Sequence, residues 1–285
     1  MENLRKRIRQ IKEKRPVYQE ILDFYQKVRE EQEGIKISLG TEPFLLKTEG
    51  KNLLTQEGFP LIRKEDFPLD REASVHLFQS LCRIAKEANP FMSEQVRRIE
   101  ETIERRRLNL KELLKDGFKD KKIEQIAEEL GFDKKVLLFL IRNSVKPSIE
   151  AGVKQVSKEF ESDTWLRGIC PICGSLPYLA LLDEEVGRRS LLCSFCGYQW
   201  RIERLLCPFC NNKEQQSLHY LYAEEEESYR INLCEKCHQY IKTIDLRRTE
   251  GSDPSVEDLA TLHLDILASQ KGYKRPVPTP WIDLK

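Results

Sequence analysis

The chain has 285 residues, of which a third are Asp, Glu, Lys or Arg, and its formal net charge at pH 7 is +1. Its longest apolar run, VLLFLI at 136–141, is far shorter than a membrane span, which argues against membrane insertion and predicts a buried helix. The basic N-terminus lacks the apolar stretch of a secretory signal. We therefore expect a cytoplasmic protein, in which nine cysteines do not form a disulfide framework.

Helices are predicted for most of residues 1–164. After Pro16, the apolar residues Val17, Ile21, Phe24 and Val28 recur at helical spacing. A segment rich in Gly and Pro follows and shows no period, which indicates a long packed loop at 34–70. Helical spacing then returns in four segments, at 71–88, 91–113, 120–130 and 133–161.

Eight of the nine cysteines form four C-x-x-C turns, namely Cys170 and Cys173, Cys193 and Cys196, Cys207 and Cys210, and Cys234 and Cys237. One such turn directs two sulfurs at a single point, and two turns complete a tetrahedral site with four sulfur ligands. Nineteen residues separate the first turn from the second and twenty-three the third from the fourth, which favours pairing in sequence order. We predict two bound metal ions, iron or zinc, whose full coordination makes them structural.

The residues around the cysteines read as short strands. YLALL and RRSLL flank the turn-forming DEEVG. YQWRIERLL alternates as a strand should and links the second C-x-x-C turn, or knuckle, to the third. Near the end of the chain, Asp253 and Pro254 suit the start of a helix, whose apolar stripe includes Val256, Leu259, Ile266 and Leu267. The last dozen residues are predicted to form an extended tail.

The fold class expected from these patterns is α+β. A mostly helical N-terminal domain (1–164) precedes two tandem rubredoxin-like or zinc-ribbon-like β modules (165–204 and 205–245), and a C-terminal helix and tail (246–285) complete the chain.

Other uses of the cysteines are disfavoured. Thiol-redox pairs require a thioredoxin-like strand and helix, and iron–sulfur clusters usually have more compressed cysteine runs. Nucleic-acid binding is also disfavoured, because residues 165–245 have nine basic and eleven acidic side chains. With eight thiolates and two divalent ions their charge is about −6, the wrong sign for phosphate contacts.

Single residues outside the knuckles give no sign of catalysis. Cys82 lies on an apolar helix face and is interpreted as a buried thiol. His238 follows a complete cysteine set and is interpreted as a supporting or surface residue, and the other histidines have no ligand-spaced partners. The sequence contains no Walker loop, G-x-G-x-x-G fingerprint or Ser-His-Asp pattern, so we do not expect an enzyme.

Several segments carry a family resemblance, which is most specific over 165–270. WLRGICPICGSLP, GRRSLLCSFCGYQWRIERLLCPFC, CEKCHQYIKTID and DPSVEDLATLHLDIL together resemble the formate dehydrogenase accessory protein family, FdhE. The matching residues beyond the cysteines are Trp165, Arg167, Gly174, Pro177, Trp200, Arg204, Tyr240, Lys242 and Asp258.

The resemblance implies a cytoplasmic accessory protein with a helical domain and two rubredoxin-like modules, usually described as binding iron. Its implied partner is the large catalytic subunit of formate dehydrogenase, which carries molybdenum or tungsten with a pterin and iron–sulfur clusters and is held until mature. We expect Trp165 and Trp200 to pack the modules onto the helices. For Arg167 and Arg204, a local ion pair and a contact with the partner both stay open.

Two other functions remain as alternatives, a zinc-ribbon nucleic-acid-binding protein and a redox-active iron protein that acts on the formate dehydrogenase. Whether the chain forms a homodimer is also left open.

Overall fold

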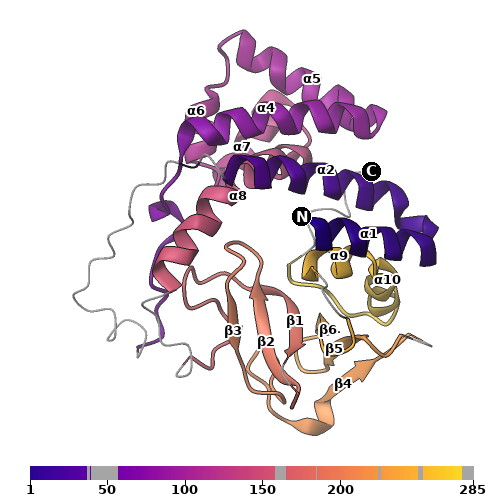
Figure 1. The fold of residues 1–285 in the computed structure, drawn as a ribbon. Helices are drawn as coiled ribbons and strands as arrows, with labels where there is room; N and C mark the ends of the chain where they lie inside the picture. The colour runs from indigo at the N-terminus through magenta and orange to yellow at the C-terminus, as the bar shows by residue number, and fades with distance from the viewer. Residues whose placement is uncertain are drawn as a thin grey trace.

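Helices precede strands along the chain, and a short pair of helices follows the strands (Figure 1). The computed structural model describes residues 1–36, 39, 57–157, 165–183, 185–223, 226–249 and 253–277. The helical N-terminal region, the sheet with its cysteine groups and the final helices confirm the predicted α+β class. The N-terminal helices are α1 (Glu2–Lys14), α2 (Gln19–Lys36), α4 (Arg71–Ala88), α5 (Pro90–Glu104), α6 (Leu110–Lys115), α7 (Asp120–Leu130) and α8 (Lys134–Val156), with short 3₁₀ turns η1 (Pro16–Tyr18) and η2 (Lys64–Asp66).

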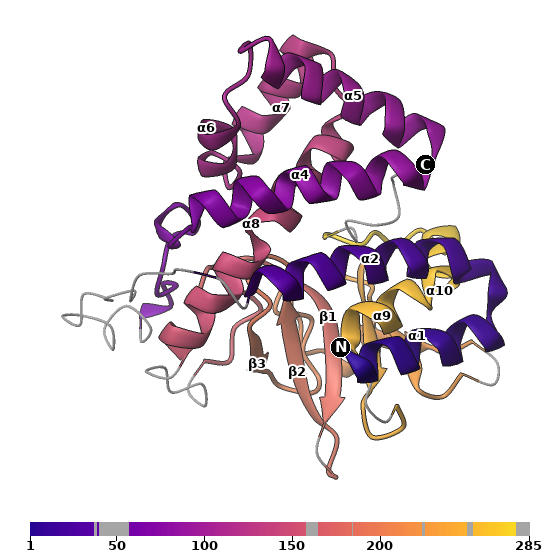
Figure 2. The same ribbon diagram turned by 45° about the horizontal axis from the view of Figure 1, so that its top comes forward.

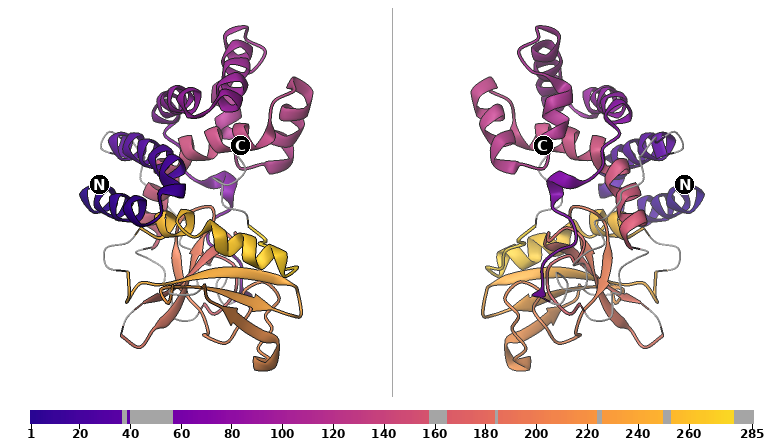
Figure 3. Two further views of the ribbon diagram at one scale, coloured as in Figure 1. Left: turned by 90° about the vertical axis from the view of Figure 1, so that its right-hand side faces the viewer. Right: turned by 90° about the vertical axis from the view of Figure 1, so that its left-hand side faces the viewer.

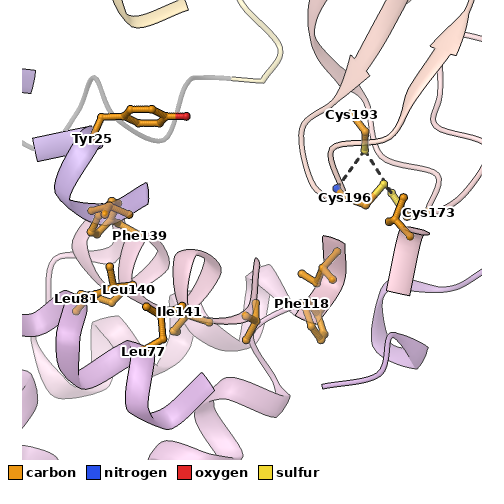
Figure 4. Close-up of a cluster of buried hydrophobic side chains, with 14 of the residues drawn as sticks. Tyr25, Leu77, Leu81, Phe118, Phe139, Leu140, Ile141, Cys173, Cys193 and Cys196 are labelled. Carbon is orange, nitrogen blue, oxygen red and sulfur yellow. Dashed lines mark hydrogen bonds between the residues drawn. The ribbon is translucent and has the colours of Figure 1, made fainter. Parts of the chain in front are cut away.

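Helix α8 lies at the centre of the helical region, as its apolar run predicts. Its residues Leu140 and Ile141 are fully buried, and Figure 4 shows them beside Leu77 and Leu81 of α4. The helix begins after Asp133, whose carboxylate accepts hydrogen bonds from the first backbone N–H groups of the helix and so satisfies donors that have no partner inside it. Among the described helices, none is long and apolar enough to cross a membrane.

Two helix predictions are wrong in detail. The segment predicted as one helix over 91–113 is α5 and α6, because Arg106 between them has a left-handed backbone (φ 57°) and Asn109 caps the second helix. Val17 is 84% exposed, because Pro16 starts the separate turn η1 and the buried face of α2 begins later, at Leu22. Most of the loop predicted at 34–70, namely 37, 38 and 40–56, lies outside the described residues, as do 158–161 of the last predicted helix.

All six strands of the described chain form one sheet, in the order β3-β2-β1-β6-β5-β4. Each half is an antiparallel three-stranded meander that carries one cysteine group, and the halves meet where β1 and β6 pair in parallel. The predicted boundaries at 164, 204 and 245 stay a prediction. The strands are β1 (Pro177–Asp183), β2 (Arg188–Cys193), β3 (Gln199–Arg201), β4 (Leu218–Leu221), β5 (Tyr229–Cys234) and β6 (Gln239–Asp245).

Strands β1 and β2 coincide with the predicted YLALL and RRSLL. The third predicted strand, YQWRIERLL, is mostly irregular, since β3 covers only Gln199–Arg201. Residue 184 of the predicted turn lies outside the described residues.

The C-terminal helices cover one face of the sheet. Asp253 caps α9 (Pro254–Leu259) as predicted, but the chain turns at Ala260 and Thr261 before α10 (Leu262–Gln270), so the predicted single helix is two. Ile266 is 59% exposed and does not belong to the buried stripe. Of the predicted tail, 278–285 lie outside the described residues, whereas Lys274 forms a β-bridge with Gln239 of β6.

Helix α1 contacts a helix near the C-terminal end of the chain. Arg7 Nη2 donates to Glu257 Oε2 of α9 at 2.9 Å, and Glu257 is completely buried. Figure 1 shows α9 and α10 between α1 and the sheet, and Figures 2 and 3 show the two helices beside the sheet from other directions. Helix α1 therefore packs against α9, the first of the two C-terminal helices, and Arg7 also contacts Tyr229 of β5.

Candidate metal centres

The first cysteine group lies at one end of the β1–β2–β3 meander. Cys170 and Cys173 precede β1, Cys193 ends β2, and Cys196 lies in the turn before β3. The Cys173 Sγ lies 3.5 Å from the Sγ atoms of both Cys193 and Cys196, and the Cys170 and Cys196 Sγ atoms are 3.6 Å apart. All four thiols are buried.

The second group repeats this plan in the other half of the sheet. Cys207 and Cys210 precede β4, Cys234 ends β5, and Cys237 lies in the turn before β6. The Cys207 and Cys237 Sγ atoms are 3.7 Å apart, and those of Cys210 and Cys234 are 3.6 Å apart. This group is more open, because Cys210 is exposed and Cys237 is half-buried.

These distances fit a four-sulfur metal ion. A tetrahedral ion with metal–sulfur bonds of about 2.3 Å separates its sulfurs by about 3.8 Å, close to the observed spacing. In each group all four sulfurs lie within 4.8 Å of one another, whereas a disulfide would need about 2.05 Å. The structure thus contains two Cys₄ groups able to hold metal, paired in sequence order as predicted, and the geometry does not distinguish iron from zinc.

A shared backbone turn positions the cysteine pairs. The N–H groups of Cys170, Cys193 and Cys207 each donate to the carbonyl five residues later at 2.9 Å, which folds the knuckle back on itself. The residue after the second cysteine of every knuckle has a left-handed backbone, and these four residues are Gly174, Gly197, Asn211 and His238. Such a conformation suits Gly and costs other residues free energy, least for Asn among the common side chains.

Hydrogen bonds to sulfur differ between individual thiols. The bonds from Cys170, Cys193 and Cys196 lower the pKa of Cys173, whereas burial raises the pKa of Cys170 and Cys196. In the second group burial would raise the pKa of Cys234, but hydrogen bonds led by the Cys237 backbone lower it to about 7. Metal loading needs four thiolates, so it releases the remaining protons and weakens in acid.

Aromatic side chains join the first group to the helical region. The ring of Phe195, which lies between Cys193 and Cys196, meets Phe67 edge-on at a centroid distance of 5.7 Å and Phe118 at 5.4 Å. Figure 4 places Phe118 between the helical core and the cysteines. The backbone adds to this joint, since Leu61 N–H donates to Pro171 O at 2.9 Å.

The predicted role of the two tryptophans is confirmed. Trp165 and Trp200 are 2% and 1% exposed and belong to the same apolar core as the helices. Their indole N–H groups donate to the carbonyls of Ile169 (2.8 Å) and Arg167 (2.9 Å). Among the described residues Arg167 forms no ion pair; its guanidinium stacks over the Trp165 ring and donates to the Glu57 carbonyl.

The remaining predicted residues lie away from the sulfur sites or at their edge. Cys82 is buried in α4, where burial raises the pKa of its thiol to about 12. His238 shapes the last knuckle through its backbone, and its ring packs near Tyr273. Arg204 is exposed and has no ion pair among the described residues. His219 contacts Glu235, and His263 contacts Glu226 and Tyr18, at distances of 2.9 Å.

Sequence reasoning missed the charges buried next to the sheet. Lys242 of β6, only 2% exposed, contacts Asp258 Oδ1 at 2.5 Å and Asp265 Oδ2 at 2.7 Å. Arg275 completes the network, with Nη2 at 2.9 Å from Asp258 Oδ1. The available signal was the position of Lys242 in QYIKTID, between Ile241 and Ile244 in a strand buried on both faces.

Comparisons with known proteins agree with this geometry. Residues 169–204 match the model of the FdhE central domain, and residues 205–282 match that of the FdhE C-terminal domain. An FdhE homolog from Aquifex aeolicus is 29% identical over 271 residues, which cover 94% of this chain and 90% of the relative. Over residues 169–282 the chain therefore matches the FdhE family.

Other FdhE relatives match shorter parts of the chain. The FdhE homolog from Haemophilus ducreyi is 28% identical over 57% of this chain and 53% of its own length, and the one from Pseudomonas aeruginosa is 34% identical over 41% and 40%. The crystal structure of the FdhE protein from Pseudomonas aeruginosa superposes with a TM-score of 0.72, covering 98% of this chain and 94% of the other. At 20% identity, that superposition shows a shared fold.

Proposed function

We propose that this chain is a cytoplasmic accessory protein, not an enzyme, that binds the large catalytic subunit of a molybdenum- or tungsten-containing formate dehydrogenase and assists its maturation. The observation that carries the proposal is the pair of four-sulfur groups within the segments that match the FdhE central and C-terminal domains. The match to the family supports the accessory role in formate dehydrogenase maturation.

In this proposal, Cys170, Cys173, Cys193 and Cys196 bind one metal ion, and Cys207, Cys210, Cys234 and Cys237 bind the other. Four thiolates fill the coordination shell of each ion, so each ion supplies folding free energy and leaves no position for a substrate. The ions hold the knuckle turns at the ends of the strands. The sheet then presents a rigid surface, together with the helices packed on it, to the client protein.

Metal analysis tests the ligand assignment. We expect two equivalents of iron or zinc per chain after anaerobic purification, and an iron-loaded protein would be coloured. A colourless zinc protein that still supports maturation would eliminate the redox alternative. A chain that binds no metal when fully folded would contradict the assignment.

Affinity purification from the native host tests the partner. The tagged chain should recover the large formate dehydrogenase subunit, identified by mass spectrometry, and a tagged unrelated zinc-binding protein expressed at the same level serves as the control. Removal of the gene should reduce formate-dependent dye reduction, and the reintroduced gene should restore it. Unchanged activity in the deletion strain, together with no recovered subunit, would contradict the proposal.

A gel shift tests the nucleic-acid alternative. The acidic sheet region should give no tight complex with DNA or RNA at physiological salt. A salt-sensitive complex of high affinity would favour the alternative.

A further inference from the structure

Arg189 is a buried cation at the junction between the two halves of the sheet. It lies on β2, the strand that ends at Cys193 of the first group, and is only 3% exposed. Its Nη1 donates to the carbonyl of Leu206 at 2.7 Å and to that of Arg204 at 3.3 Å. Since Leu206 directly precedes Cys207, this side chain ties the strand of one cysteine group to the first knuckle of the other.

The guanidinium has more donors than partners. Within the described part of the chain, its Nε and Nη2 atoms are buried and have no hydrogen-bond acceptor, and no carboxylate forms an ion pair with it. Burial and, to a smaller degree, the nearby charge of Arg230 lower the pKa of Arg189 to about 10, although Cys207 acts in the opposite direction. A buried cation without a counter-charge costs several kcal/mol, so a stable fold needs an anion close to this position.

The second cysteine group is adjacent. A cavity of about 110 Å³ is lined by Arg189 together with Cys207 and Cys234, and Leu206 and Leu233 also line it. Four thiolates around a divalent ion carry a net charge of −2, and hydrogen bonds or cations next to the sulfurs are a common way to stabilise such a centre.

A repeated sequence pattern places a second arginine nearby. Arg189 precedes Cys193 by four residues in RSLLC, and Arg230 precedes Cys234 by four residues in RINLC. Arg230 lies over the ring of Tyr220 at 5.5 Å, and its Nε has no acceptor among the described residues. The two hairpins therefore bring like charges together, which the fold tolerates only where negative charge offsets them.

We propose that Arg189 is the counter-charge and positioning residue of the second metal centre. It holds the chain before Cys207 through the Leu206 carbonyl, and its charge offsets that of the loaded tetrathiolate. The inference rests on the proposed metal binding by Cys207, Cys210, Cys234 and Cys237. It means that a residue from the first half of the sheet takes a direct part in metal binding by the cysteine group of the second half.

The test uses the full chain loaded with ¹¹³Cd²⁺, because its NMR spectrum resolves two four-sulfur centres in one sample. The variants are Arg189→Met, Arg189→Lys and the control Arg201→Met, which removes an exposed arginine of the neighbouring strand β3. Cys237→Ser identifies the resonance of the second centre. Stepwise addition of EDTA then gives the relative affinity of each centre.

We expect Arg189→Met to weaken the second centre by about 10- to 100-fold, as removal of supporting groups around a metal site does, and to leave the first centre unchanged. Arg189→Lys keeps the charge and should restore most of the affinity, and Arg201→Met should match the wild type. Restoration by lysine separates the effect of charge from that of packing.

Three outcomes would overturn the inference: an unchanged second centre in Arg189→Met, a lysine variant as weak as the methionine variant, or loss of both ions from both variants. If Arg189→Met fails to fold but Arg189→Lys keeps both ions, the inference stands. A wild-type chain without a second resonance would instead contradict the proposed metal binding itself.

Discussion

The two cysteine groups share one chain pattern, yet their surroundings differ. The first is buried and is joined to the helices by Phe195, which packs against Phe67 and Phe118. The second exposes Cys210, and its half of the sheet is held to α9 and α10 by the buried charges around Lys242. The difference teaches that a repeated metal-binding turn can act as a joint between regions in one copy and as a surface feature in the other.

The largest expected effect comes from removing one ligand in each group. Cys173→Ser and Cys237→Ser should each lower the metal content from two ions to about one, because three sulfurs hold a structural ion poorly. Cys173→Ser should also lower the thermal stability of the helices, since the first group belongs to their apolar core. Circular dichroism at 222 nm during heating measures the thermal stability of the helices in each variant.

Cys237→Ser is the matched control for that prediction, because its residue is half-buried and does not belong to the apolar core of the helices. Equal melting of the helices in both variants would show that the two groups do not differ as described.

The next effect concerns the charges that hold the second half of the sheet. Lys242→Met should lower the free energy of unfolding by about 3–5 kcal/mol, because it leaves the carboxylates of Asp258 and Asp265 buried without one of their cations. Lys213→Met, which breaks the exposed pair with Glu203, should cost less than about 1 kcal/mol. Urea unfolding measures both, and similar values would contradict the structural role of the buried network.

Acid should act on the same network. Burial alone would raise the pKa of Asp258, but the charges of Arg275 and Lys242 outweigh it and lower the pKa below its ordinary value. The carboxylate therefore stabilises the fold fully above about pH 4 and loses this contribution as the pH falls through the lowered value. In Asp258→Asn, unfolding followed by Tyr and Trp fluorescence should depend less steeply on pH in this range than in the wild type. An equally steep dependence would assign the acid sensitivity to other groups.

The smallest expected effect on stability comes from the left-handed residue that follows the second cysteine of each C-x-x-C turn. Gly197→Ala should destabilise the chain by about 1–2 kcal/mol, because the residue has φ 71° and an added Cβ would meet no neighbour within 4 Å, so backbone strain alone acts. His238→Gly, at the corresponding turn of the second group, should have the opposite sign and stabilise by up to about 1 kcal/mol. Thermal unfolding of metal-loaded protein compares them, and destabilisation by both would contradict the shared turn geometry.

Local chemistry made the cysteine groups predictable. The C-x-x-C spacing specifies a knuckle, and pairing in sequence order needs only a hairpin between knuckles, so all eight residues could be assigned to two groups. Asp253 and Pro254 likewise mark a helix start through their own backbone preferences. The break at Arg106 was not predictable, because a non-Gly residue seldom adopts a left-handed backbone and the apolar spacing continues across it.

The other features that the sequence did not predict depend on long-range contacts. The parallel pairing of β1 with β6 joins residues about sixty positions apart, and neither strand carries a mark of its partner. Lys242 and Arg189 are charged residues in strands, which sequence patterns place at the surface. Their burial depends on acidic groups and carbonyls that come from other segments.

The pairing of β1 with β6 also has a consequence for biosynthesis. A growing chain leaves the ribosome from its N-terminus, so β1 is exposed with one edge unpaired until the residues up to Asp245 have emerged. Helix α1 waits longer still, because its partner Glu257 follows later. The β1–β6 pairing and then the α1–α9 contact therefore form late in synthesis, and a cysteine pair that bound an ion early would fix one end of β1 before β6 emerges.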